Sequence, residues 1–210
     1  MKALYDKTDP ALAMALSGAT EANAAAIGAG MGGAGGAGGD AFVTLMTAAG
    51  TFMGDANGPC AAMVESTGWD THVNQVGPFG VLPRNLATLD RGLDALASGL
   101  GARWSQTAVV VVTEFGRTVA RNGTAGTDHG TGGAAVLVGG AVKGGRVIAD
   151  WPGLSSGALY QGRDLRPTAD LRAVLKAALV EHMGIEPAHV ERSVFPDSAA
   201  APLTRDLFRA

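Results

Sequence analysis

Residues 107–113 read TAVVVVT, and this unbroken apolar run constrains the fold more than any other part of the chain. Side chains branched at Cβ favour extended backbone, and a strand that is apolar at every position must be covered on both faces. A central strand of a parallel sheet, with helices on either side, meets that requirement. Shorter apolar runs at residues 60–65 (CAAMVE) and 134–138 (AAVLV) are expected to form further buried strands.

Three segments are expected to be helices that cover this sheet. Leucines recur every three or four residues across residues 82–100, and residues 41–53 show a second amphipathic pattern. Residues 168–170 (TAD) are in position to cap a third helix, which runs to about Met183. Because strands alternate with helices, we expect an α/β fold, a three-layer sandwich with a mainly parallel sheet.

The N-terminal part has a different composition. Residues 9–26 are rich in alanine and predict a helix, whereas residues 28–39 (GAGMGGAGGAGG) contain eight glycines. Glycine-rich loops can cradle phosphate, but this one lacks a Gly-Lys-Ser/Thr ending and a preceding strand, so a flexible linker is the better interpretation. We therefore expect a helical segment with a linker at residues 1–57 and the α/β part at residues 58–210.

The overall composition excludes several classes of protein. A hydrophobic content of 47% over 210 residues predicts a packed core. The formal net charge is −3 and no run of lysine and arginine occurs, so nucleic acid is not an expected partner. No stretch reaches the roughly 18 apolar residues of a membrane span, and the first residues lack the apolar core of a signal peptide. The one cysteine, Cys60, is expected to be a buried packing thiol.

Asp70 and His72 lie two positions apart, just after the expected strand at residues 60–65. In extended backbone such residues project to the same side, so both side chains can point at a common centre. Mixed oxygen and imidazole ligands suit Zn²⁺ or Mn²⁺. The alternative is an Asp–His couple that is joined only by a hydrogen bond.

Glu114 follows the valine run directly, at the carboxyl end of the expected central strand. Ligand sites of open α/β sheets gather at that end, which makes Glu114 a candidate metal ligand. Its alternatives are a helix N-cap or a salt bridge to Arg117. Arg117 is either an anion-binding residue or the partner of Glu114.

Asp128 and His129 are adjacent, so their side chains diverge in extended backbone and only one is expected to be a direct ligand. We expect His129 to be that ligand, with Asp128 either a second ligand or the acceptor that orients an imidazole. His182 and His189 are expected to be surface histidines. The predicted metal-site residues are therefore Asp70, His72, Glu114, Asp128 and His129.

These motifs resemble a bacterial family called domain of unknown function 1501, of the alkaline phosphatase-like superfamily that includes the sulfatases. The resemblance covers about residues 58–197. It rests on GWDTHVNQ (68–75), LDRGLDAL (89–96), VVVVTEFGRTVARNG (109–123), GTDHGTGGAAVLVGGAVKGG (126–145) and PTADLRAVLKAAL (167–179). It implies an alkaline phosphatase-like sandwich of which this chain is the C-terminal part, with the N-terminal half missing.

The resemblance also implies roles for individual residues. Residues 63–72 are similar to a strand that carries an Asp and a His ligand of one metal, which residues 128–130 complete. Glu114 and Phe115 stand where an Asp-His-Gly motif serves a second metal, so one imidazole ligand is missing. Glu65 matches a carboxylate that serves an auxiliary magnesium. Zn²⁺ or Mn²⁺ is implied first, with Mg²⁺ or Ca²⁺ as alternatives.

Members of the superfamily carry their nucleophile in the N-terminal half, which this chain is expected to lack. Thr8, Ser17 and Thr20 lie on the alanine-rich helix with no strand before them, so none is expected to be a nucleophile. The implied function is that of a fragment of a metal-dependent hydrolase of small anionic phosphate or sulfate esters, incomplete by itself. The alternatives are a non-catalytic binding or structural module and an enzyme with another substrate class. The family resemblance also implies an exported, periplasmic protein.

Overall fold

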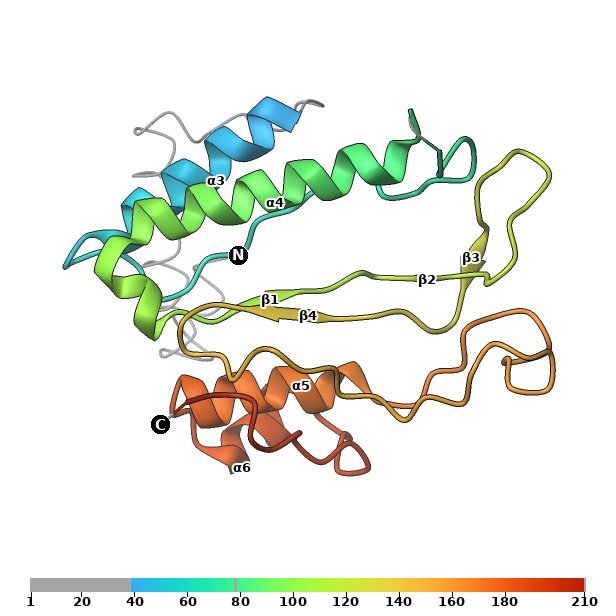
Figure 1. Cartoon of the computed structure of the whole chain (residues 1–210). Helices are drawn as coiled ribbons and strands as arrows, with labels where there is room; N and C mark the ends of the chain where they lie inside the picture. The colour runs from blue at the N-terminus through green and yellow to red at the C-terminus, as the bar shows by residue number, and fades with distance from the viewer. Residues whose placement is uncertain (1–38, 78, 210) are drawn as a thin grey trace, which may run out of the picture. The chain divides into compact units, whose positions relative to one another are not determined.

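The computed structural model describes residues 39–77 and 79–209, which divide into two compact units (Figure 1). Of these described residues, one unit holds those up to Trp69 together with Arg84–Gly101, and the other holds those of Asp70–Pro83 together with those from Ala102 onwards. The expected helix at residues 9–26 lies outside the described residues, as does all of the glycine-rich segment except Gly39. The division at residues 57 and 58 stays a prediction.

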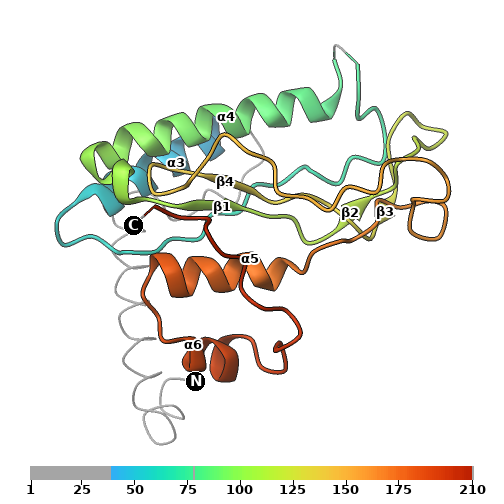
Figure 2. The ribbon, with the colours of Figure 1, turned by 60° about the horizontal axis from the view of Figure 1, so that its bottom comes forward.

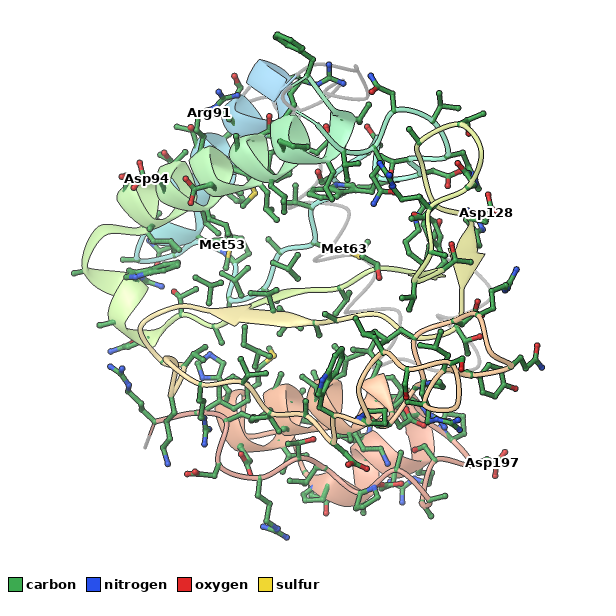
Figure 3. The ribbon with its side chains drawn as sticks, turned by 45° about the vertical axis from the view of Figure 1, so that its right-hand side comes forward. Met53, Met63, Arg91, Asp94, Asp128 and Asp197 are labelled. Carbon is green, nitrogen blue, oxygen red and sulfur yellow. The ribbon has the colours of Figure 1, made fainter. Side chains whose placement is uncertain are left out.

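The described part of the first unit contains a pair of helices, and both were predicted. Helix α3 (Gly39–Gly54) packs on α4 (Val81–Leu100) through glycines. A Cβ added to Gly50 would lie 2.6 Å from the carbonyl oxygen of Leu96, so the two backbones are in direct contact. Arg91 and Asp94 project from the exposed face of α4, as Figure 3 shows. The expected helices at residues 41–53 and 82–100 are therefore confirmed.

The segment that leads from α3 towards the site is not a strand. Residues 61–71 belong to no helix or strand, and the side chain of Met63, labelled in Figure 3, is 99% exposed. The prediction of a buried strand at residues 60–65 is wrong, because an apolar run becomes a strand only where a neighbouring strand takes up its backbone hydrogen bonds. Cys60, which was expected to be buried, is exposed.

The second unit contains two short antiparallel sheets. Strand β1 (Val109–Val111) pairs with β4 (Val136–Val138), and β2 (Gly116–Arg117) pairs with β3 (His129–Gly130), as Figure 1 shows. Among the described residues these are the only sheets.

The predicted fold is therefore wrong. The described residues do not form the C-terminal part of a three-layer, mainly parallel sandwich of the alkaline phosphatase-like type. A parallel pair needs a crossover connection, usually a helix. Between β1 and β4 the chain instead makes the β2–β3 hairpin and returns, which imposes an antiparallel pairing. The valine run is half-buried rather than covered on both faces.

Helix α5 (Leu171–Ala177) continues as one π-helical stretch, Ala178–His182, and so confirms the helix predicted there. The carboxylate of Asp170 caps it by accepting a hydrogen bond from the backbone N–H of Arg172 at 2.9 Å. The hydrophobic core of the second unit contains residues from α5, from the turn after β4 and from the C-terminal segment. Figure 2 shows this segment running beside β1 and α5. Its buried members are Val142, Ala177, Leu207 and Phe208.

The remaining elements are a 3₁₀ helix at Gly101–Gln106, helix α6 (Pro187–His189) and a π-helical turn at Val190–Val194. Lys176 of α5 is buried, and its Nζ donates to the carboxylate of Glu191 and to two backbone carbonyls of the C-terminal segment. None of the helices in the described part is long and apolar enough to cross a membrane.

Candidate metal centre

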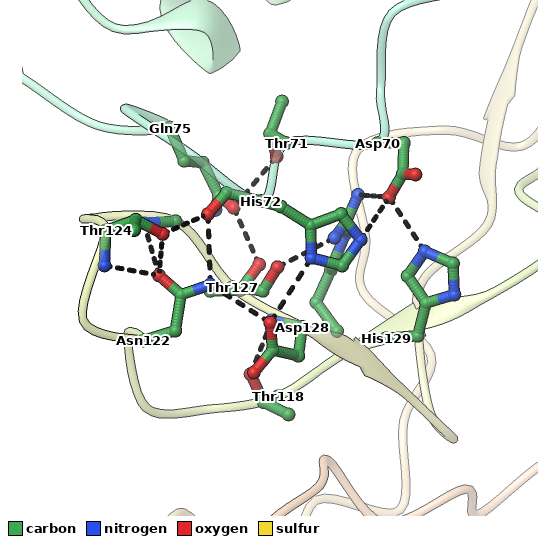
Figure 4. Close-up of polar contacts among 12 residues, drawn as sticks. Asp70, Thr71, His72, Gln75, Thr118, Asn122, Thr124, Thr127, Asp128 and His129 are labelled. Atoms are coloured by element: carbon green, nitrogen blue, oxygen red, sulfur yellow. Dashed lines mark hydrogen bonds and ion pairs between the residues drawn. The ribbon is translucent and has the colours of Figure 1, made fainter.

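The candidate site forms where residues 70–75 run beside the loop that joins β2 to β3 (Figure 4). The backbone N–H of Asn74 donates to the carbonyl of Thr124 at 3.0 Å. A Cβ on Gly126 would lie only 2.1 Å from the carbonyl carbon and oxygen of His72, so no other residue fits there without moving the backbone. This close approach brings two segments that are about fifty residues apart in sequence into one site.

Three side-chain nitrogens converge on a single carboxylate oxygen at its centre. Oδ1 of Asp70 lies 2.7 Å from Nε2 of His129, 2.9 Å from Nη2 of Arg117 and 3.0 Å from Nε2 of His72. Figure 4 shows the two imidazoles on either side of this carboxylate. Asp70 and His72 therefore do point at a common centre, and His129 joins them from β3.

His72 is held at both ring nitrogens. Nε2 faces Asp70, and Nδ1 lies 3.2 Å from Oδ1 of Asp128. A neutral imidazole donates from one nitrogen only, so the other nitrogen of a neutral His72 ring has a lone pair that can bind another partner. With the proton on Nδ1, Asp128 orients the ring and Nε2 keeps a lone pair for a metal.

His129 is oriented by an aromatic neighbour. Its ring stacks on Phe115 with 4.2 Å between centroids and 10° between planes. The guanidinium of Arg117 lies 4.9 Å from the centroid of the same Phe115 ring. Phe115, which stands where the resemblance would place another imidazole, thus supports the ring of one metal-ligand candidate.

Asp70, His72 and His129 form a donor set that fits a divalent metal. Their ligand atoms all lie within 4.8 Å of one another, and the side chains are 54%, 43% and 51% exposed. Three mixed nitrogen and oxygen ligands are the usual protein contribution to a catalytic zinc site, which keeps a further position open. A metal here would replace the contacts that now join the two imidazoles to Asp70.

The other predicted residues lie elsewhere. Asp128 contacts the far nitrogen of His72 and is not part of the three-residue cluster. Glu114 is exposed and is also outside the cluster. Arg117 donates to Asp70 and, at 2.9 Å, to the carbonyl of Thr127, so it holds the central carboxylate in place.

The hydrogen bonds of the site favour ionised carboxylates. The hydrogen bond from His129 is the main cause that lowers the pKa of Asp70, with help from Arg117 and His72 and against partial desolvation. The hydrogen bond from Asn122 is the main cause that lowers the pKa of Asp128, followed by the one from His72. Both groups are therefore charged at neutral pH and able to bind cations.

Sequence reasoning missed two amide side chains of this site. Oε1 of Gln75 accepts from the hydroxyls of Thr71 and Thr127, at 2.8 and 2.6 Å. Asn122 contacts both His72 and Asp128. The Asn122-Gly123 dipeptide is a turn signal, but a turn signal does not tell which side chains the turn will meet.

The family comparison agrees with the motifs. A family model described as protein of unknown function (DUF1501) matches residues 6–195, and the chain belongs to this family. No curated protein and no solved structure matches the chain.

Proposed function

We propose that this chain supplies the metal-binding part of a metal-dependent hydrolase of phosphate or sulfate esters. Asp70, His72 and His129 hold one divalent ion, Zn²⁺ or Mn²⁺, and Asp128 orients His72. The convergence of both imidazoles on the carboxylate of Asp70 is the observation that carries the proposal. When bound, the ion would act as a Lewis acid towards an ester oxygen.

The ester class comes from the likeness of residues 63–72 and 109–130 to the metal-binding motifs of alkaline phosphatase-like enzymes. On that likeness we also propose a relationship to this superfamily at the level of the motifs. The parallel sheet of those enzymes is not part of the proposal. An exported, periplasmic setting is proposed on the same likeness.

An exposed arginine beside the site supports an anionic ligand. The side chain of Arg163 is 60% exposed, its Nη2 lies 3.4 Å from the carbonyl of His129, and its Nε forms an ion pair with Asp164 at 2.8 Å. A guanidinium held in this way keeps further N–H groups for an anion. Arg117, in contrast, already uses donors on Asp70 and Thr127.

We further propose that the chain is not catalytically complete alone. Each of the four threonine hydroxyls around the site donates a hydrogen bond to an oxygen within the network, so none is poised as a nucleophile. These hydroxyls belong to Thr71, Thr118, Thr124 and Thr127. The nucleophile is therefore not assigned to any of the site hydroxyls that the structure describes.

Metal analysis and calorimetry test the metal site. We expect one Zn²⁺ or Mn²⁺ per chain, and we expect His129→Gln to weaken binding by roughly tenfold or more, because one direct ligand is lost. His189→Gln is the matched control, since His189 is exposed and lies outside the cluster. Substoichiometric metal in the unaltered chain, or equal affinity of His129→Gln, would contradict the proposal.

A non-catalytic binding module is the second candidate, and Phe115 at a ligand-type position favours it. Phosphate and sulfate separate the two functions. A hydrolase site binds these anions more tightly with its metal than without it, whereas a module without ester chemistry shows no such dependence. Isothermal titration with and without Zn²⁺ measures the difference.

A further inference from the structure

Asn122 lies in the loop between β2 and β3, and its side chain makes four hydrogen bonds besides a close contact with the hydroxyl of Thr124. The carbonyl oxygen Oδ1 accepts from the backbone N–H groups of Thr124 and Gly126, at 3.1 and 3.0 Å, and lies 2.9 Å from the hydroxyl of Thr124. These donors fix the orientation of the amide, because the reverse orientation would place its NH₂ group against other N–H groups.

The opposite end of the amide joins two parts of the metal site. Nδ2 donates one hydrogen to the carbonyl of His72 and the other to Oδ1 of Asp128, both at 3.0 Å. These two acceptors belong to residues that face each other, since Nδ1 of His72 lies 3.2 Å from the same oxygen of Asp128. The half-buried side chain of Asn122 therefore holds both the backbone carbonyl of His72 and the carboxylate of Asp128, which contacts the His72 ring.

We propose that Asn122 is a positioning residue that selects the metal-binding form of His72, an inference that rests on the proposed metal site. By holding Asp128 as an acceptor against Nδ1, it keeps the ring proton on that nitrogen. Nε2, which lies 3.0 Å from Oδ1 of Asp70, is then the nitrogen whose lone pair can bind a metal in place of that contact. Asn122 does this without contacting the metal.

The chemistry needs an amide at this position. Aspartate has the same shape and keeps the acceptors for the backbone N–H groups of the turn, but it has no hydrogen to donate and it would repel Asp128. Asn122→Asp therefore separates the turn from the positioning role. Asn57→Asp is the matched control, because Asn57 is exposed and the substitution introduces the same charge in the other compact unit.

Two measurements on the full chain test the inference. Calorimetry with Zn²⁺ alone is expected to show roughly tenfold or greater weakening in Asn122→Asp and no change in Asn57→Asp, in the range typical of residues behind metal ligands. In the metal-free chain, ¹⁵N NMR of the imidazole of His72 is expected to show a changed proton distribution in Asn122→Asp only. A merely structural role would lower the melting temperature and leave these ring signals unchanged.

The outcomes distinguish the two proposals. If the unaltered chain binds no Zn²⁺ while Asn122→Asp alters the His72 ring signals, the metal function is overturned and the positioning role stands. If the unaltered chain binds Zn²⁺ and Asn122→Asp changes neither the affinity nor the ring signals, the positioning role is overturned. Should Asn122→Asp not fold, Asp128→Asn removes the same charged acceptor from its other end, and unchanged Zn²⁺ affinity and ring signals in that variant overturn the inference.

Discussion

Two polar networks of the second unit differ in how completely their groups are paired. The Nζ of Lys176 is buried and has three acceptors, Glu191 at 2.7 Å and the carbonyls of Ser198 and Ala201 at 2.7 and 2.9 Å. An ammonium has three hydrogens, so every donor is used. In the site, three side-chain nitrogens lie within 3.0 Å of one oxygen of the exposed Asp70. The first network is closed and stabilises the fold, whereas the second holds groups that can change partners.

The largest expected effect on stability belongs to the buried network. Lys176→Met leaves the buried carbonyls of Ser198 and Ala201 without their donor, and each unsatisfied buried acceptor costs about 1 to 3 kcal/mol, whereas the carboxylate of Glu191 is 43% exposed and can be hydrated. Chemical denaturation followed by circular dichroism measures the loss. An unfolding free energy close to that of the unaltered chain would show that this network is not structural.

Asp70→Asn is expected to reduce metal binding and to leave the stability of the metal-free chain nearly unchanged. Without metal, the unfolding midpoint should stay near that of the unaltered chain, because the carboxylate is exposed and surface ion pairs contribute little. With Zn²⁺ at a hundred times its dissociation constant, the unaltered chain should gain about 2.7 kcal/mol by mass action and the variant should gain none. Thermal melts with and without Zn²⁺ provide the comparison, and stabilisation of both chains by the metal would break it.

The smallest expected effect concerns an exposed carboxylate with a purely local role. Hydrogen bonds from Arg172 lower the pKa of Asp170 to about 2. Because the folded-state pKa is depressed, this contribution is complete above the ordinary value of about 3.9 and is lost as the pH falls towards 2. Asp170→Ala should cost about 1 kcal/mol at neutral pH through the lost helix cap, and the difference from the unaltered chain should shrink below pH 4.

Asn at the same position keeps a capping oxygen and serves as the control. Asp170→Asn should therefore lose only the part that depends on charge, a few tenths of a kcal/mol. Urea denaturation at pH 7 and at pH 2.5 measures both variants. A difference for Asp170→Ala that did not change with pH would show that the charge of Asp170 is irrelevant to the cap.

The sequence predicted the local elements better than their pairing. The three helices follow from apolar spacing, which is a property of each segment alone. The valine run of β1 indicates that a strand is covered, but not by what or in which direction. That outcome depends on the hairpin between β1 and β4, whose short strands at Gly116 and His129 carry no strong periodicity.

The site was predicted in part for the same reason. Asp70 and His72 do meet, but not through the extended backbone that was expected, because the backbone N–H of His72 donates to the carbonyl of Asp70 at 3.1 Å and so closes a tight turn. Asn122 and Gln75 act through contacts with segments distant in sequence, which no local pattern encodes. Glu114 is predicted as a ligand from its place after a strand, but that strand ends at Val111 and does not continue to the site.

The approach of Gly126 to His72 gives the site a sensitivity that its polar contacts do not suggest. Charge and hydrogen bonding orient the side chains of the metal-ligand candidates. The distance between the backbone of His72 and the β2–β3 loop, however, is possible only because Gly126 has no Cβ atom. A single methyl group at residue 126 would wedge the two segments apart while every donor and acceptor remained in the chain. The close approach of these two segments therefore depends on the absence of a side chain at residue 126.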